Sequence, residues 1–251
     1  MTNTPTAATD TGIWTGDAPV GGPIPSAFFG QGENEPYAGS LSVGLGHLTL
    51  RPESLRPEIA GPEPIGPVHF SMLGWSAPAT ASERELLRTL RGPVLDVGCG
   101  PGRMLAAARE LGLMAMGVDT SAHAVRLATS RGVAAIHGSI FNPVPHEGAW
   151  ASALLMDGNI GIGGNIPVLL ERIASLLAPG GQALAEAETP DSLDVAYVAV
   201  LEDSAGRASA AFPWARAGAK ALAAHAVRAG LTCLATRTLH GRVFLTLERR
   251  V

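Results

Sequence analysis

Residues 94–103 read Val-Leu-Asp-Val-Gly-Cys-Gly-Pro-Gly-Arg, and this stretch decides the fold. Its mostly apolar start predicts a short buried strand, three alternating glycines follow, and residues 102–111 have the apolar spacing of a helix. Glycines let the backbone turn sharply and approach a ligand closely, and the free N–H groups at a helix start favour an anionic group. The stretch therefore predicts a strand, a ligand-binding turn and a helix.

A carboxylate follows this turn at the distance typical of nucleotide-binding folds. Asp119 comes about 20 residues after Gly98, at the end of the next expected strand, residues 114–118. A carboxylate at that place can accept hydrogen bonds from both hydroxyls of a ribose. The third glycine comes one residue too early for the dinucleotide-binding pattern Gly-x-Gly-x-x-Gly. The geometry alone does not choose between NAD and S-adenosylmethionine (SAM).

From Gly92 onward, short apolar runs alternate with helical stretches, which is typical of βαβ units on a parallel sheet. Strands are expected at 93–97, 114–118, 133–136, 150–156 and 182–187. Helices are expected at 102–111, 121–130, 165–178 and about 214–229. Two further strands, about 231–237 and 242–248, lie close enough in sequence to pair as a hairpin. Before Gly92, strands are expected at 41–50 and 68–73, and a capped helix at 82–90.

With Asp96 inside it, the glycine stretch resembles motif I of the class I SAM-dependent methyltransferases, an acidic residue followed by Gly-x-Gly-x-Gly. The resemblance continues in order over about residues 90–250. Residues 118–121 match the ribose-binding strand end, residues 138–140 the adenine loop, and residues 177–181 the turn into the fifth strand. Residues 157–164 and 212–215 resemble those of an actinobacterial-type group of small-molecule methyltransferases.

The resemblance implies an α/β fold, a doubly wound Rossmann-like sheet of seven strands with an N-terminal cap. The implied activity is transfer of a methyl group from SAM to O, N or C of a small-molecule acceptor. The implied SAM site comprises Asp96, Gly98, Cys99, Gly100, Asp119, Thr120, Ser139, Ile140, Met156, Asp157 and Gly158. Many members have Asp where this chain has Ser139, whose hydroxyl binds adenine more weakly.

The candidate catalytic residues are Asp157 and Glu186. Both follow or end strands whose carboxyl ends face the expected cleft, and Glu188 lies on the same side of the strand as Glu186. Asp157 either orients the ligands or caps a turn. Glu186 or Glu188 either acts as a general base or lies at the surface. The sulfonium already activates the methyl group, so a base is needed only where the nucleophile must lose a proton. Arg103 either pairs with the methionine carboxylate or is solvated.

Composition limits the classes of molecule that this protein is expected to bind. The formal net charge is −4 and the basic residues are scattered, which disfavours a nucleic-acid substrate. Without a long apolar run or a leader pattern, we expect a cytoplasmic protein with no membrane span. The two cysteines and the His, Asp and Glu spacing predict no metal site. The oligomeric state is left open.

The expected organisation is a flexible arm at 1–35, a cap or lid at 36–90 and a SAM-binding domain at 91–251. Three alternatives stay open. An NAD-linked oxidoreductase is disfavoured by Asp96 and by the glycine spacing. A non-catalytic SAM-binding module and a SAM-dependent enzyme that does not transfer methyl groups are the other two.

Overall fold

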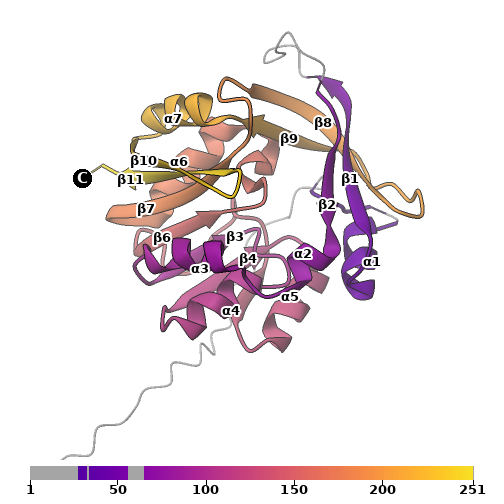
Figure 1. Cartoon of the computed structure of the whole chain (residues 1–251), viewed down its shortest axis with the longest axis horizontal. Coiled ribbons are helices and arrows are strands. Elements are labelled where there is room, and N and C mark those ends of the chain that lie inside the picture. Colours follow the sequence, from indigo (N-terminus) through magenta and orange to yellow (C-terminus); the bar gives the residue numbers. More distant parts are fainter. Residues whose placement is uncertain (1–27, 33, 56–64, 251) are drawn as a thin grey trace, which may run out of the picture.

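The computed structural model describes residues 28–32, 34–55 and 65–250 (Figure 1). Most of the expected N-terminal arm, residues 1–27, lies outside the described residues. Among the residues described, no helix combines the length and the hydropathy needed to cross a bilayer.

A seven-stranded sheet forms the centre of the molecule, with strand order β10-β11-β7-β6-β3-β4-β5. The five strands from β7 to β5 pair in parallel, and β11 pairs antiparallel with β7 and with β10. The bounds are β3 (Val94–Val97), β4 (Ala115–Asp119), β5 (Ala134–His137), β6 (Trp150–Leu155), β7 (Leu177–Ala187), β10 (Leu231–Leu239) and β11 (Arg242–Arg249). The predicted α/β sheet and its terminal hairpin are confirmed.

Helices cover both faces of this sheet. Successive residues of a strand point to opposite faces, and β3 shows the consequence. Leu95 and Val97 pack with α6 (Ile166–Leu176) and α7 (Ala219–Arg228), whereas Val94 packs with α3 (Ala81–Arg88) and α4 (Arg103–Glu110). The helix α5 (Ala122–Ser130) follows β4. The sheet is doubly wound, as the sequence predicts.

A second sheet of four strands, in the order β2-β1-β8-β9, stands beside the first (Figure 1). It joins β1 (His47–Leu55) and β2 (Val68–Ser71) to β8 (Asp194–Asp203) and β9 (Phe212–Ala217). The sequence pattern predicts neither β8 nor β9 and predicts a helix from about 214, whereas α7 begins at Ala219. Alanine-rich sequence around β9 favours a helix locally, and pairing with β8 overrides that preference.

The N-terminal segment also differs from the expectation. The predicted strand 41–50 is wrong in its first part, which forms α1 (Pro36–Val43). Proline suits the first turn of a helix, and Gly44 ends α1 at φ +68°. Tyr37 and Leu41, one helical turn apart, are both buried. The end of the second expected strand is replaced by the short helix α2 (Met72–Ser76).

The predicted capped helix at 82–90 is present as α3. Its cap is Thr80, whose hydroxyl accepts a hydrogen bond from the N–H of Glu83 while the Glu83 carboxylate accepts one from the N–H of Thr80. This reciprocal pair is a capping box. It fixes Glu83 at the start of α3, where its other carboxylate oxygen, Oε1, contacts Arg242 at 2.7 Å.

Helix α6 offers a test of the core within one element. Ile173→Ala should lower the free energy of unfolding by about 2–5 kcal/mol, because this fully buried side chain packs against the sheet. Val168→Ala in the same helix, at a side chain that is 46% exposed, should change it by less than about 0.5 kcal/mol. Urea denaturation of both variants measures the difference, and equal losses would contradict this packing.

Candidate active site

The turn between β3 and α4 contains three glycines in backbone conformations that other residues rarely adopt. Gly98, Gly100 and Gly102 have φ angles of +70°, +53° and +78°. A Cβ atom on Gly98 would lie 2.7 Å from Nδ2 of Asn159, so there is no room for a side chain at this point. The backbone itself therefore lines the cleft at the carboxyl end of the sheet.

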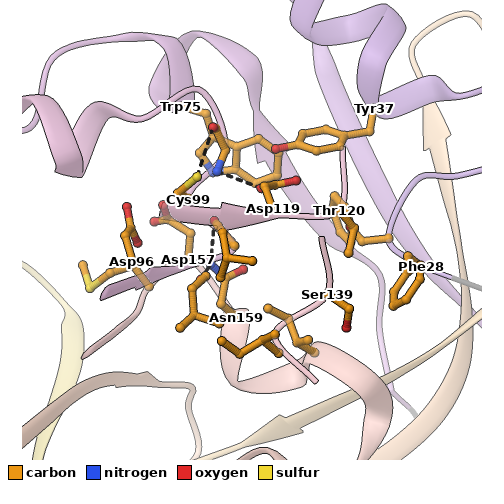
Figure 2. A pocket seen from close by; sticks show the side chains of 18 of the residues that line it. Phe28, Tyr37, Trp75, Asp96, Cys99, Asp119, Thr120, Ser139, Asp157 and Asn159 are labelled. Atoms are coloured by element: carbon orange, nitrogen blue, oxygen red, sulfur yellow. Dashed lines mark hydrogen bonds between the residues drawn. The ribbon is translucent and has the colours of Figure 1, made fainter. Parts of the chain in front are cut away.

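Asn159, just after β6, fastens this glycine loop. Its Nδ2 donates hydrogen bonds to the carbonyl oxygens of Val97 at 2.7 Å and of Gly98 at 3.0 Å (Figure 2). The side chain thus joins the ends of two neighbouring strands. Asn159 therefore positions the loop.

Asp119, at the end of β4, holds the same loop from the other side. Its Oδ2 accepts a hydrogen bond from the N–H of Gly100 and its Oδ1 one from the N–H of Ser121, both at 2.8 Å. Burial raises the pKa of this carboxyl, and the two N–H donors act in the opposite direction. Each carboxylate oxygen has a further lone pair for a donor in the cleft.

Asp96, inside β3, is 2% exposed and lines the same cleft. No described residue donates a hydrogen bond to its Oδ2. Burial raises the pKa of Asp96 from its usual 3.8 to about 7; the nearby Arg103 guanidinium opposes this, and Asp157 and Asp119 add to it. A buried polar atom without a partner in a cleft marks a place for a ligand donor.

Seven aromatic side chains cover the cleft, and we call them the aromatic roof. They are Phe28, Phe29, Tyr37, Phe70, Trp75, Phe212 and Trp214. The ring of Phe29 lies in the middle, with its centroid 5.3–6.2 Å from those of five others. In Figure 2, Tyr37 and Trp75 lie next to Asp119, and Asn159 and Ser139 lie on the opposite side of the cavity. The cleft therefore combines a polar floor with an apolar cover.

The structure brings the predicted cofactor residues together. Those that line the cleft are Asp96, Gly98, Cys99, Gly100, Asp119, Thr120, Ser139, Ile140, Met156 and Asp157. Gly158 lines a second pocket that adjoins the cleft. Their binding roles stay predictions at this point.

Five charged residues from five segments form an ion network beside the cleft. Arg103 pairs with Glu83 and, at 2.6 Å, with Asp157. Arg242 contacts Glu83 at 2.7 Å, Asp157 at 2.9 Å and both carboxylate oxygens of Glu186 at 2.6 Å. The network holds three carboxylates and two guanidinium groups. Arg103 is mostly buried within it, so the solvated alternative for this side chain is wrong.

The network includes both candidate catalytic residues. Each carboxylate oxygen of Asp157 and of Glu186 already accepts a hydrogen bond from Arg103 or Arg242. The N–H of Asp157 also donates to Glu186 at 2.7 Å. The geometry fixes both side chains firmly, and their catalytic roles stay predictions. Glu188 differs, because Arg216 contacts only its Oε2.

The sequence predicts neither Phe29 in the lining of the cleft nor Glu83 and Arg242 in the ion network beside it. The capping box was a signal for Glu83, but it indicates a helix start and not a network. Arg242 follows the turn of the terminal hairpin and reaches the site through the pairing of β11 with β7. Nothing in the local sequence indicates this contact.

Comparison with known proteins agrees with this geometry. Residues 78–234 match the sequence model of a family described as a methyltransferase domain. A SAM-dependent methyltransferase from Bacteroides fragilis, solved with S-adenosyl-L-homocysteine, is 17% identical with a TM-score of 0.68, over 87% of this chain and 94% of that chain. The CcbJ methyltransferase from Streptomyces caelestis is 16% identical with a TM-score of 0.53, over 71% and 92%.

A third similar structure is 1,6-didemethyltoxoflavin-N1-methyltransferase from Burkholderia thailandensis, solved with 1,6-didemethyltoxoflavin and S-adenosylhomocysteine. It is 18% identical with a TM-score of 0.50, over 68% of this chain and 78% of that chain. A search of curated protein sequences gave no match.

The sheet order and the glycine loop define a Rossmann-like fold of the class I methyltransferase type. Because the family model covers more than half of its length, the chain belongs to the methyltransferase-domain family. The match includes the glycine loop, Asp119, Asn159 and the whole ion network except Arg242.

The buried carboxyl of Asp96 predicts a pH dependence. The unfolded chain releases this proton near pH 4, whereas the folded chain retains it to about pH 7, so stability should fall as the pH rises between these values. Asp96→Asn should reduce this pH-dependent loss in the free energy of unfolding by up to about 4 kcal/mol. Denaturation at several pH values measures it, with Asp191→Asn, at an exposed position, as control. Parallel profiles for Asp96→Asn and the unsubstituted chain would contradict the assigned pKa.

Proposed function

We propose that this chain transfers the methyl group of SAM to O, N or C of a small-molecule acceptor. The observation that carries the proposal is the buried Oδ2 of Asp96, which has no partner among the described residues and lines a cleft beside the glycine loop. The methionine part of SAM ends in an ammonium group, which donates hydrogen bonds and is cationic. Asp96 is the residue that would accept from it.

The other cleft residues fit the remaining parts of SAM. Asp119 has lone pairs left for the two ribose hydroxyls. Gly98 and Gly100, which adopt positive φ angles, have no side chains that would occupy the space for SAM. Ser139 accepts a weak bond from the N–H of Phe141 at 3.3 Å, which leaves its O–H to donate to an adenine nitrogen. When bound, SAM supplies a methyl carbon activated by a positive sulfur.

The N-terminal segment completes the site in this proposal. Residues 36–90 act as a cap over the SAM-binding domain, residues 91–251. Tyr37, Phe70 and Trp75 come from this segment and belong to the aromatic roof. A roof of large apolar rings excludes water, which strengthens the polar contacts beneath it and leaves room for small acceptors.

This chain's residues mainly align the reactants. The ion network fixes Asp157 and Glu186 at the carboxyl ends of β6 and β7, so both are held in one orientation before an acceptor arrives. The net charge of −4 supports a small molecule over a nucleic acid. The B. thailandensis structure, which holds a small-molecule acceptor, supports the same class. A cytoplasmic location is part of the proposal.

Calorimetric titration with SAM, S-adenosylhomocysteine and NAD tests the cofactor. We expect micromolar binding of both adenosyl-sulfur compounds and none of NAD. Asp119→Asn should weaken SAM binding at least about tenfold, because an amide retains one acceptor oxygen and loses the charge. Glu110→Gln, at an exposed ion pair with Arg84, is the matched control and should bind normally.

Binding of NAD alone, or of none of the three compounds, would overturn the proposal. Unchanged SAM affinity in Asp119→Asn would remove the ribose role from this residue and leave the cofactor assignment to Asp96 and the glycine loop.

A further inference from the structure

A second pocket adjoins the cofactor cleft on the side of β1 and β2. The two share the side chains of Phe70, Trp75, Arg103, Asp157 and Trp214 as common walls. A molecule in the second pocket therefore lies against the end of the cleft that holds Asp157 and Arg103. In the proposed function this is the end nearest the methionine part of SAM.

The charges around this second pocket are not balanced. Its wall contains the whole ion network, Glu83, Arg103, Asp157, Glu186 and Arg242, with three carboxylates against two guanidinium groups. All but Arg242 have side chains that are at most 25% exposed, so solvent compensates this excess incompletely. The pocket disfavours an anion and favours a cation.

Glu188 adds an available hydrogen-bond acceptor to the same wall. Arg216 Nε donates to its Oε2 at 2.7 Å, whereas no described residue donates to its Oε1. The side chain is 23% exposed and lines the pocket. Unlike Asp157 and Glu186, whose four oxygens are occupied by arginines, Glu188 has one oxygen left for a ligand.

Aromatic rings form the apolar part of the wall. Phe70, Trp75 and Trp214 line the second pocket, and the rings of Phe70 and Trp75 lie 5.0 Å apart at an angle of 34°. Ring faces attract ammonium groups as well as apolar groups. An amine with an apolar body matches both parts of this wall.

We propose that the second pocket holds the methyl acceptor and that the acceptor is an amine, bound by Glu188 Oε1 between the rings of Trp75 and Trp214. This inference rests on the proposed function and narrows its acceptor to one chemical class. An alcohol would leave the excess negative charge of the wall unbalanced, and a carboxylic acid would add to it.

The chemistry is balanced by groups already present. The amine binds as an ammonium ion and gives one proton to water or to Glu188. The nitrogen lone pair then forms a bond to the methyl carbon while the carbon–sulfur bond breaks, and its electron pair goes to sulfur. The product leaves as a methylated ammonium ion together with S-adenosylhomocysteine, and the single proton released before the transfer passes to solvent, directly or from Glu188.

Matched amines and alcohols test the inference by binding to protein saturated with S-adenosylhomocysteine. The pairs are benzylamine with benzyl alcohol, and 2-phenylethylamine with 2-phenylethanol, measured by calorimetry. We expect the amine to bind at least tenfold more tightly in at least one pair. Glu188→Gln should reduce that preference to about threefold or less, because the amide still accepts from Arg216 but carries no charge. Equal binding within both pairs, or no binding, overturns the inference.

Two further variants keep the test decisive. Glu202→Gln removes a partly exposed carboxylate that pairs with Arg51 in the second sheet and lines neither pocket, and it should retain the full amine preference. If Glu188→Gln fails to fold, as shown by its melting temperature, Trp75→Leu replaces it and should lower the amine preference severalfold. If the unsubstituted chain binds S-adenosylhomocysteine but shows no preference for amines, only this inference is rejected. If the unsubstituted chain does not bind S-adenosylhomocysteine, the proposed function is rejected.

Discussion

The fastening of the glycine loop is the interaction on which the rest of the site depends. Where the loop leaves β3, the N–H groups of Gly98 and Cys99 donate to the carbonyl oxygen of Val118 on β4, and side chains from neighbouring strand ends bond to other backbone groups of the loop. Nδ2 of Asn159 donates hydrogen bonds to the carbonyl oxygens of Val97 and Gly98, and Oδ2 of Asp119 accepts one from the N–H of Gly100. Because parallel strands bring their carboxyl ends to one edge of the sheet, three short segments distant in sequence meet there. The backbone is held in place before any ligand arrives.

The cover of the site depends on a second, long-range constraint. β1 pairs with β8. The N-terminal segment is therefore attached to a strand that comes after β7 of the main sheet in the sequence. This pairing brings Phe70 and Trp75 into the lining of the same cleft as Phe212 and Trp214. Gln31 adds a direct connection to the floor, because its Nε2 donates to the carbonyl oxygen of Thr120 at 3.0 Å. Cover and floor are therefore parts of one folded unit.

The sequence predicts the floor of this site far better than its cover. Buried parallel strands and the helices between them have local signatures, and Gly98 and Asp119 have a characteristic spacing, so β3, α4 and β4 follow from local pattern. The second sheet has no such signature. Leu41 and Val43 alternate like a strand yet lie in α1, and Trp214 stands in alanine-rich sequence yet lies in β9. The strand conformation of Trp214 is decided by pairing with Tyr197 on β8, and local periodicity does not encode this pairing.

The same distinction explains why charged residues were hard to assign from sequence. Asp157 and Glu186 were selected because they end strands at the correct edge, and the structure puts them there. What a carboxylate can do depends on which of its oxygens are occupied, and arginines on α4 and β11 decide that. Asp96 and Glu188 each keep an oxygen that no described residue contacts. The two oxygens lie in adjoining pockets, so the unoccupied acceptors, and not the number of acidic residues, mark where ligand groups are to be sought.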